Sequence, residues 1–341
     1  MSGAGNRSTP VTQTRRRVLS TMALAGAAAL TRPPTLLAAG ERLETTSIRI
    51  GKSGSICIAP QYVAEDLLRA EGFTDIRYVD RVPTVDSADV DEIDITAMFA
   101  SSLVLMREAN RPITILGGLH IGCFELFGTK EIRRIADLKG KRVAVPSLGG
   151  SPWHAFISVI VAQVGLDPTR DLNWVVSQDP KPPELFAAGK ADAFIGFPPD
   201  PQEMRAREIG HVVVNSALDR PWADYFCCLI YGNRDFVRNN PVATKRAMRA
   251  ILKSADFCAD DPSAVARRLV DGRFTPRYDY AVQTMRELPY GKWREYDAED
   301  SLRFYALRLH EAELIKSSPQ KIIAGGTDWR FFNELKRELK A

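Results

Sequence analysis

The sequence predicts an α/β fold with mainly parallel sheets, followed by a helix-rich C-terminal third. Three observations carry this prediction. Short apolar runs bounded by glycine alternate with segments whose apolar residues recur at helical spacing. The alternation repeats up to about residue 231, which is typical of βα units in a parallel sheet. After Asn240 the alternation stops, and only helical patterns follow.

The first βα unit illustrates the pattern. Residues 47–50 (SIRI) predict a strand that ends at Gly51. Residues 61–70 place apolar side chains on one helical face, which predicts a helix that Gly72 ends. Residues 76–79 then predict the second strand.

The later units follow the same pattern. Further strands are predicted at 93–98, 113–116, 121–127, 142–145, 173–176, 193–195, 211–214 and 225–231, with a bend at Gly117-Gly118. The helices between them are predicted at 101–108, 132–138, 153–164 and 183–188. The C-terminal helices are predicted at 243–260, 262–270, 278–288, 298–314 and 327–339.

Residues 1–39 have the organisation of a secretory signal. They contain five arginines and no acidic residue, then an Ala-rich apolar run and small residues at Ala38-Ala39. Arg15-Arg16-Arg17 resembles the paired arginines of the bacterial twin-arginine export signal. A membrane anchor is the alternative, but the apolar run is too short for a hydrocarbon core of about 30 Å. We therefore expect export to the periplasm.

The charge of the chain argues against nucleic-acid binding. The full sequence carries 46 basic and 42 acidic residues, a net charge of +4. Without the five arginines of the signal, 41 basic residues face 42 acidic ones, a net charge of −1. The excess of positive charge belongs to the signal, so we expect no nucleic-acid partner.

The cysteine pattern predicts neither a disulfide framework nor a metal site. The five cysteines are an odd number for an oxidising compartment, and no C-x-x-C spacing occurs. Cys227-Cys228 lie next to each other in an apolar strand. We expect all five to be small buried hydrophobic residues, and a twin-arginine substrate that folds before export can bury its thiols in reduced form.

No catalytic motif is present in the sequence. The four histidines form no H-E-x-x-H, and G-x-S-x-G, the P-loop and the dinucleotide-binding glycine pattern are also missing. We therefore expect a protein that is not an enzyme and that needs no cofactor.

The loops that follow the predicted strands share small hydroxyl residues, glycines and aromatics. These loops lie where open parallel sheets bind ligands, outside the carboxyl ends of the strands. The capping of helices is the simpler role for each serine taken singly. Ser151 followed by Pro152 at a helix start, after Gly149-Gly150, predicts an anion site made of free backbone N–H groups. Trp153, Phe197, Trp222 and Tyr225 are candidates to enclose an apolar part of the ligand, or to belong to the core.

An ordered series of motifs resembles periplasmic solute-binding proteins of ABC importers. The segment 137–145 (DLKGKRVAV) is similar to their DLKGKxVAV segment. The glycine-serine turn, the GLDP at 165–168, the LFAAGKADA at 185–193 and a proline-rich turn at 197–201 follow in the family's order. The resemblance covers residues 47–260 and is strongest to the nitrate, sulfonate and taurine type, with relatives among thiamine-precursor binding proteins.

The resemblance implies a two-lobed periplasmic binding protein fold of type II. Lobe one is expected at 47–122 plus 232–341 and lobe two at 123–231, with crossing strands at 123–127 and 226–231. The expected ligand-binding residues are Ser55, Phe99, Ala100, Ser101, Gly150, Ser151, Trp153, Phe197 and Tyr225. Phe197-Pro198-Pro199-Asp200 departs from the family's aromatic-Asp-Pro arrangement, which affects the expected ligand.

The expected function is capture of a small anionic solute between two closing lobes and its delivery to an inner-membrane permease, by a protein that acts as a monomer. Two alternatives stay open. One is an enzyme like the eukaryotic synthases of the thiamine pyrimidine, which carry several consecutive cysteines where this chain has only Cys227-Cys228. The other is a ligand-binding partner of a membrane sensor.

Overall fold

The computed structural model describes residues 42–80, 89–149 and 151–340. The predicted signal at 1–39 lies outside these residues. Among the helices that the structure describes, none has the length and apolar character needed to cross a membrane.

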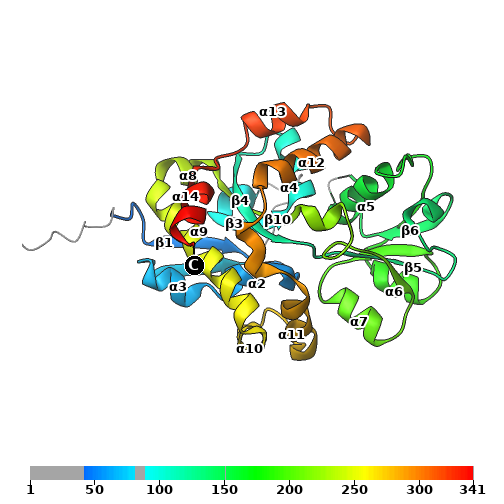
Figure 1. Cartoon of the computed structure of the whole chain (residues 1–341), viewed down its shortest axis with the longest axis horizontal. Helices are drawn as coiled ribbons and strands as arrows, with labels where there is room; N and C mark the ends of the chain where they lie inside the picture. Colours follow the sequence, from blue (N-terminus) through cyan, green and yellow to red (C-terminus); the bar gives the residue numbers. More distant parts are fainter. Residues whose placement is uncertain (1–41, 81–88, 150, 341) are drawn as a thin grey trace, which may run out of the picture. The chain divides into compact units, whose positions relative to one another are not determined.

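The first of two sheets has five strands in the order β2-β1-β3-β10-β4 (Figure 1). Its strands are β1 (Ser47–Gly51), β2 (Asp75–Val79), β3 (Ile95–Phe99), β4 (Ile113–Ile121) and β10 (Phe226–Asn233). β10 runs antiparallel to both β3 and β4, whereas β1 pairs in parallel with β2 and β3. Four strands therefore share one direction, and β10 alone opposes them.

The second sheet repeats this arrangement in the order β7-β6-β8-β5-β9. Its strands are β5 (Glu125–Gly128), β6 (Arg142–Val145), β7 (Asn173–Val176), β8 (Ala193–Gly196) and β9 (His211–Asn215). β5 is antiparallel to β8 and β9, and β6 is parallel to β7 and β8. The predicted α/β class with mainly parallel sheets is thus confirmed.

Helices cover both sheets, because strands buried on both faces need apolar layers on each side. The helices that precede β10 are α2 (Ala59–Tyr62), α3 (Glu65–Ala70), α4 (Ala100–Glu108), α5 (Pro152–Ala162), α6 (Pro182–Ala187) and α7 (Asp200–Ala206). Those that follow are α8 (Arg234–Asn239), α9 (Pro241–Asp260), α10 (Pro262–Asp271), α11 (Tyr278–Glu287), α12 (Ala298–Glu311), α13 (Pro319–Ala324) and α14 (Arg330–Glu338). Figure 1 shows α5, α6 and α7 around the second sheet. The C-terminal helices contact elements of both halves, since α12 packs on α4 and α5 and α11 packs on α7.

The predicted bend at Gly117-Gly118 is wrong, because β4 continues through both glycines to Ile121. The two glycines leave room for aromatic rings. A Cβ on Gly117 would lie 2.5 Å from Phe332, and one on Gly118 would lie 2.2 Å from Phe226. Close packing across the strand, and not a change of direction, explains these residues.

The predicted helix at 61–70 is split in the structure. A 3₁₀ turn, η1 (Ile56–Ile58), leads into α2, and α3 begins only at Glu65. The segment predicted as a helix at 132–138 forms only a 3₁₀ turn, η3 (Ile135–Leu138). The helices α7, α8 and α13 were not predicted, because they are too short to show a clear helical spacing of apolar residues.

The chain passes between the two sheets twice. It leaves the first sheet between β4 and β5 and returns between β9 and β10. The residues 226–231, expected to cross between lobes, instead pair with β3 and β4 inside the first sheet. The lobes expected at 47–122 plus 232–341 and at 123–231 stay a prediction, and we propose that lobe two ends at residue 225, just before β10 begins at Phe226.

Candidate functional site

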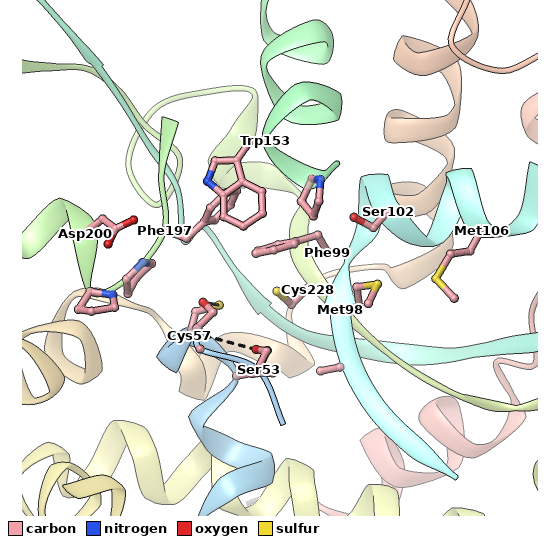
Figure 2. A pocket seen from close by; sticks show the side chains of 17 residues that line it. Ser53, Cys57, Met98, Phe99, Ser102, Met106, Trp153, Phe197, Asp200 and Cys228 are labelled. Atoms are coloured by element: carbon pink, nitrogen blue, oxygen red, sulfur yellow. Dashed lines mark hydrogen bonds between the residues drawn. The ribbon is translucent and has the colours of Figure 1, made fainter. Parts of the chain in front are cut away.

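A cavity of about 330 Å³ opens where loops from both sheets meet. Its walls come from the segments that follow β1, β3 and β8, from the start of α5, and from three residues of β3 and one of β10 (Figure 2). The lining residues are Ser53, Gly54, Ser55, Cys57, Ile58, Ala97, Met98, Phe99, Ser102, Met106, Pro152, Trp153, Phe197, Pro198, Pro199, Asp200 and Cys228. The ends of parallel strands lie at one edge of a sheet, so such a site is expected of this topology.

The loop after β1 is held in place by a tyrosine. The backbone N–H of Ser53 donates to Tyr62 Oη over 2.9 Å, and Tyr62 Oη in turn donates to the Ser53 carbonyl over 3.0 Å. Ser55, a predicted site residue, lines the cavity, and its Oγ lies 3.1 Å from Cys57 Sγ. Burial raises the pKa of the Tyr62 phenol to about 12, so the group stays a neutral donor.

The start of α4 offers free hydrogen-bonding groups to the cavity. Phe99 occupies the N-cap position and makes no side-chain cap, so the first N–H groups of the helix have no capping partner from it. Ser102 lines the cavity, is 3% exposed, and its Oγ has no hydrogen-bond partner. The Ser102 hydroxyl is therefore available to hydrogen-bond a ligand in the cavity.

The predicted neighbours of Phe99 do not reach this cavity. Phe99 lines it, but Ala100 and Ser101 are fully buried and are not among its lining residues. Helical geometry explains the difference: successive residues point about 100° apart, so Ser102 faces the cavity where Ser101 turns into the core.

The start of α5, where the sequence predicts the anion site, already has a cap. Ser151 Oγ accepts the N–H of His154 at 3.4 Å, and Pro152 at the first helical position has no N–H to offer. Ser151 does not line the cavity, whereas Trp153 does. Gly150 lies outside the described residues.

The loop after β8 supplies the fourth wall. Phe197 and Asp200 line the cavity, and Phe197 packs against both Phe99 and Trp153, with ring centroids 4.4 Å and 5.4 Å apart. Figure 2 shows these three aromatic side chains grouped together. Burial, more than the nearby carboxylates, raises the pKa of Asp200 to about 6.

Two of the aromatic candidates belong to the core. Tyr225 stacks on Phe304 at 4.1 Å and does not line the cavity. Trp222 is 2% exposed and packs against Phe124 and Phe304. The predicted site residues that line the cavity are thus Ser55, Phe99, Trp153 and Phe197, and their role in ligand binding stays a prediction.

The lining has an apolar character with few polar groups. Among the residues that the structure describes, Asp200 is the only carboxylate of the lining, and no lysine or arginine contributes to it. An anion would have to be held by the serine hydroxyls and by the start of α4. The aromatic and methionine side chains suit the apolar part of an organic molecule.

A second group of side chains lies beside this cavity and was not expected. One donor atom each from Cys57, His120, Cys123 and Cys228 lies within 4.8 Å of all the others, and all four residues are buried. Burial lowers the pKa of His120, but the neighbouring Cys228 and Cys57 outweigh it and raise that pKa to about 10. The expectation of five buried cysteines is confirmed. The sequence did not predict that three of them converge on a histidine, because 171 residues separate Cys57 from Cys228.

The family assignment follows from a comparison with family models. The model described as "NMT1/THI5 like" matches residues 76–265, more than half of the chain. The chain belongs to the NMT1/THI5-like family. This confirms the family inferred from the ordered motifs. No curated protein matches the sequence significantly.

Solved structures share the fold of this NMT1/THI5-like chain. The periplasmic nitrate-binding protein NrtA from Synechocystis PCC 6803 matches with a TM-score of 0.70 and 14% identity, over 87% of this chain and 90% of that one. The alkanesulfonate-binding protein SsuA from Xanthomonas axonopodis pv. citri, bound to MOPS, matches with 0.66 and 17%, over 84% and 100%. SsuA from Escherichia coli matches with 0.63 and 16%, over 80% and 94%. The fold is the two-lobed periplasmic binding protein fold.

Proposed function

We propose that this protein is the periplasmic solute-binding component of an ABC importer. The observation that carries the proposal is the cavity itself, whose walls come from the loops after β1 and β3 and also from the start of α5 and the loop after β8. A ligand there contacts elements of both sheets at once. Ligand binding can then stabilise a closed arrangement over an open one.

The proposed mechanism is hinge closure followed by docking. The two connections between the sheets, before β5 and before β10, are the segments that absorb such a motion. The closed form presents both lobes to an inner-membrane permease, which receives the solute. We propose that the protein acts as a monomer in the periplasm, exported by its twin-arginine-type signal, and that it is neither an enzyme nor a nucleic-acid-binding protein.

For the solute, we propose a small organic anion of the sulfonate or carboxylate class. The donors at the start of α4, with the unpartnered Ser102 Oγ and the nearby Ser55, suit one anionic group. Phe99, Trp153 and Phe197 suit an apolar body of the solute. Asp200 repels further negative charge, which disfavours a dianion, and the apolar walls disfavour an ion as small as nitrate.

A first experiment measures solute binding directly. Isothermal titration calorimetry of the purified protein against taurine, longer alkanesulfonates, nitrate, short carboxylates and an aminopyrimidine covers the charged and uncharged classes. We expect an alkanesulfonate or carboxylate with an apolar chain to bind with a Kd of micromolar order or tighter. A folded protein that binds none of these solutes contradicts the proposal.

Fluorescence then tests whether the solute occupies this cavity. Trp153 lines the cavity, whereas Trp293 is fully buried elsewhere in the core. Trp153→Phe should abolish most of the solute-induced change in emission while calorimetry still detects binding. Trp293→Phe is the matched control and should leave the change in place. A solute response that is unaltered by Trp153→Phe places the ligand elsewhere.

Detection of a reaction product would distinguish the enzyme alternative from a solute-binding protein. A pyrimidine synthase would carry iron or pyridoxal phosphate and release a new compound, which mass spectrometry of the incubated protein detects. The sensor alternative keeps solute binding but lacks a permease partner, so uptake by cells would not depend on the protein.

A further inference from the structure

Four metal-ligating side chains converge beside the solute cavity. They are Cys57, His120, Cys123 and Cys228, with donor atoms that all lie within 4.8 Å of one another. None of these residues is more than 4% exposed. Cys57 and Cys228 also line the cavity, so the cluster borders its floor (Figure 2).

The sheet brings these residues together from distant positions. His120 in β4 lies opposite Cys228 in β10, next to irregularities in the pairing of the two strands. Cys57 belongs to η1, which follows the loop after β1. Gly122, with φ +56, turns the chain directly after β4 and brings Cys123 close to His120.

The histidine in this cluster is oriented as a ligand would be. Its Nδ1 lies 3.3 Å from the carbonyl oxygens of both Ile121 and Gly122. Carbonyls only accept, so Nδ1 carries a proton, and Nε2 is the ring nitrogen left to bind a metal. Nε2 is buried and has no hydrogen-bond partner. Metal-binding histidines commonly make this contact through the nitrogen that does not bind the metal.

Neighbouring groups fix the cysteines as well. Ser216 Oγ accepts the N–H groups of Cys123 and Phe124, each at 2.9 Å, and donates to the Phe124 carbonyl at 2.8 Å. Tyr290 Oη donates to the Cys57 carbonyl at 2.8 Å, and its ring lies 5.4 Å from the ring of His120. The backbone that presents the donor atoms is therefore held in position around the cluster.

We propose that Cys57, His120, Cys123 and Cys228 bind a single thiophilic metal ion, with Zn²⁺ as the ion they fit best. Three thiolates and one imidazole form a tetrahedral ligand set typical of closed zinc sites. At a Zn–S distance of about 2.3 Å, tetrahedral ligand atoms lie roughly 3.8 Å apart, within the observed limit. On binding, the thiols release their protons to the solvent and His120 binds as the neutral imidazole.

Two simpler explanations of the cysteine and histidine cluster, hydrophobic burial and a disulfide, leave some of its features unexplained. Burial as small hydrophobic residues explains Cys258, which is also buried but is not in the cluster. It does not explain why three thiols surround an imidazole nitrogen that lacks a partner. A disulfide between two of the cysteines would leave Nε2 of His120 without a partner as well.

The test is metal binding by the full chain, independent of any solute. The protein is purified under reducing conditions, stripped with a chelator and titrated with Co²⁺, whose thiolate charge-transfer and ligand-field absorption reports tetrahedral sulfur ligation. Zn²⁺ is then added in competition, and elemental analysis gives the stoichiometry. We expect one ion per chain, with Zn²⁺ displacing Co²⁺.

Variants assign the site. Cys123→Ser and His120→Ala should each weaken Co²⁺ binding by more than about 100-fold, beyond the effect of losing an outer-shell partner. Cys258→Ala removes a buried thiol outside the cluster and should leave the spectrum and the stoichiometry unchanged. If the cluster variants do not fold, the Co²⁺ spectrum of the unaltered chain still shows whether thiolates bind the metal ion.

Three results would overturn the proposal. The first is a folded, fully reduced chain that shows no thiolate absorption with Co²⁺ and retains no Zn²⁺. The second is a disulfide between two cluster cysteines in protein isolated from the periplasm. The third is an absorption that Cys258→Ala removes and Cys123→Ser does not.

Discussion

The rings of Phe99 and Phe197 lie 4.4 Å apart at the wall of the cavity. Phe99 ends β3 in the first sheet, and Phe197 follows β8 in the second. Both side chains also contact Phe156 in α5. This aromatic group joins the two sheets directly beside the proposed solute site.

The Phe99–Phe197 contact should contribute measurably to stability. A double-mutant cycle with Phe99→Leu and Phe197→Leu, followed by urea unfolding, is expected to give a coupling energy of about 0.5–1.5 kcal/mol, the usual value for an aromatic pair. Phe99→Leu combined with Phe186→Leu is the control, because no ring contact joins these two residues, and it should give coupling near zero. Equal coupling for both pairs would show that the contact is not specific.

Asp200 should destabilise the folded protein at neutral pH. Burial raises its pKa from 3.8 to about 6, so the folded state binds the proton more tightly than the unfolded state. Stability is therefore lost as the pH rises from about 4 to about 6. We expect Asp200→Asn to raise the free energy of unfolding by about 1–2 kcal/mol at pH 7.5, after allowance for partial exposure, and by little at pH 4.

The control for Asp200 lies on the same helix. Glu203 pairs with Arg207 at 3.0 Å at the surface, so Glu203→Gln should change stability by less than about 0.5 kcal/mol at either pH. Urea unfolding at pH 4.5 and 7.5 measures all three proteins. A gain from Asp200→Asn that is the same at both pH values would contradict the assignment of the titration to Asp200.

Arg205 should stabilise the fold by compensating a buried acid. It donates to Glu125, which is 5% exposed, and to Glu287 in α11 at 2.6 Å and 2.7 Å. Burial raises the pKa of Glu125, and Arg205 opposes that shift. Arg205→Ala is expected to lower the free energy of unfolding by about 3–5 kcal/mol at pH 7, since the buried Glu125 loses its positively charged partner and keeps only the Asn215 amide.

The double variant tests that explanation. Arg205→Ala combined with Glu125→Gln removes the buried charge and should recover at least half of the lost stability. The loss of unfolding free energy caused by Arg205→Ala alone should also become smaller at low pH, where Glu125 is protonated. A double variant that is less stable than Arg205→Ala would show that Arg205 acts through packing.

Gly122 should tolerate no side chain, because two separate penalties apply there. Its φ is +56, and an added Cβ would lie 2.3 Å from Cα of Ala217. Gly122→Ala is expected to cost about 2–5 kcal/mol, combining left-handed strain with a backbone clash. Gly140 has φ +73 but nothing within 4 Å of its Cβ position, so Gly140→Ala should cost only about 1–2 kcal/mol by thermal or urea unfolding. An equal loss of stability in Gly122→Ala and Gly140→Ala would mean that the backbone at Ala217 moves to relieve the clash.

The strand pattern alone predicts much of this fold. The strands β6 and β7 match their predicted bounds, and β1 and β2 differ by a single residue, because short runs rich in β-branched and apolar residues are strong local signals. Elements that depend on packing were missed. The two glycines inside β4 make room for Phe226 and Phe332, and the order of residues along β4 does not contain that information.

Some features of the candidate site could also be predicted from the sequence, whereas others depend on tertiary packing. The strand-end loops that contain Ser55, Phe99, Trp153 and Phe197 could be found from the sequence, since parallel topology gathers such loops at one edge. The rotation of α4, which turns Ser102 toward the cavity and Ser101 into the core, could not be predicted, because it depends on how that helix packs. The cap on α5, by contrast, is predicted by Ser151-Pro152, and the bond from the His154 N–H to Ser151 Oγ confirms it.

The sequence by itself determined the α/β class, the family and the strand-end loops at which the cavity lies, because these depend on periodicity and on ordered local motifs. Only the tertiary structure decided which hydroxyls reach the cavity and that Cys57, His120, Cys123 and Cys228 meet. Donor atoms from three separate regions of the chain converge through strand register and turns. Such long-range proximity is set by the packing of the whole sheet, and no local spacing encodes it.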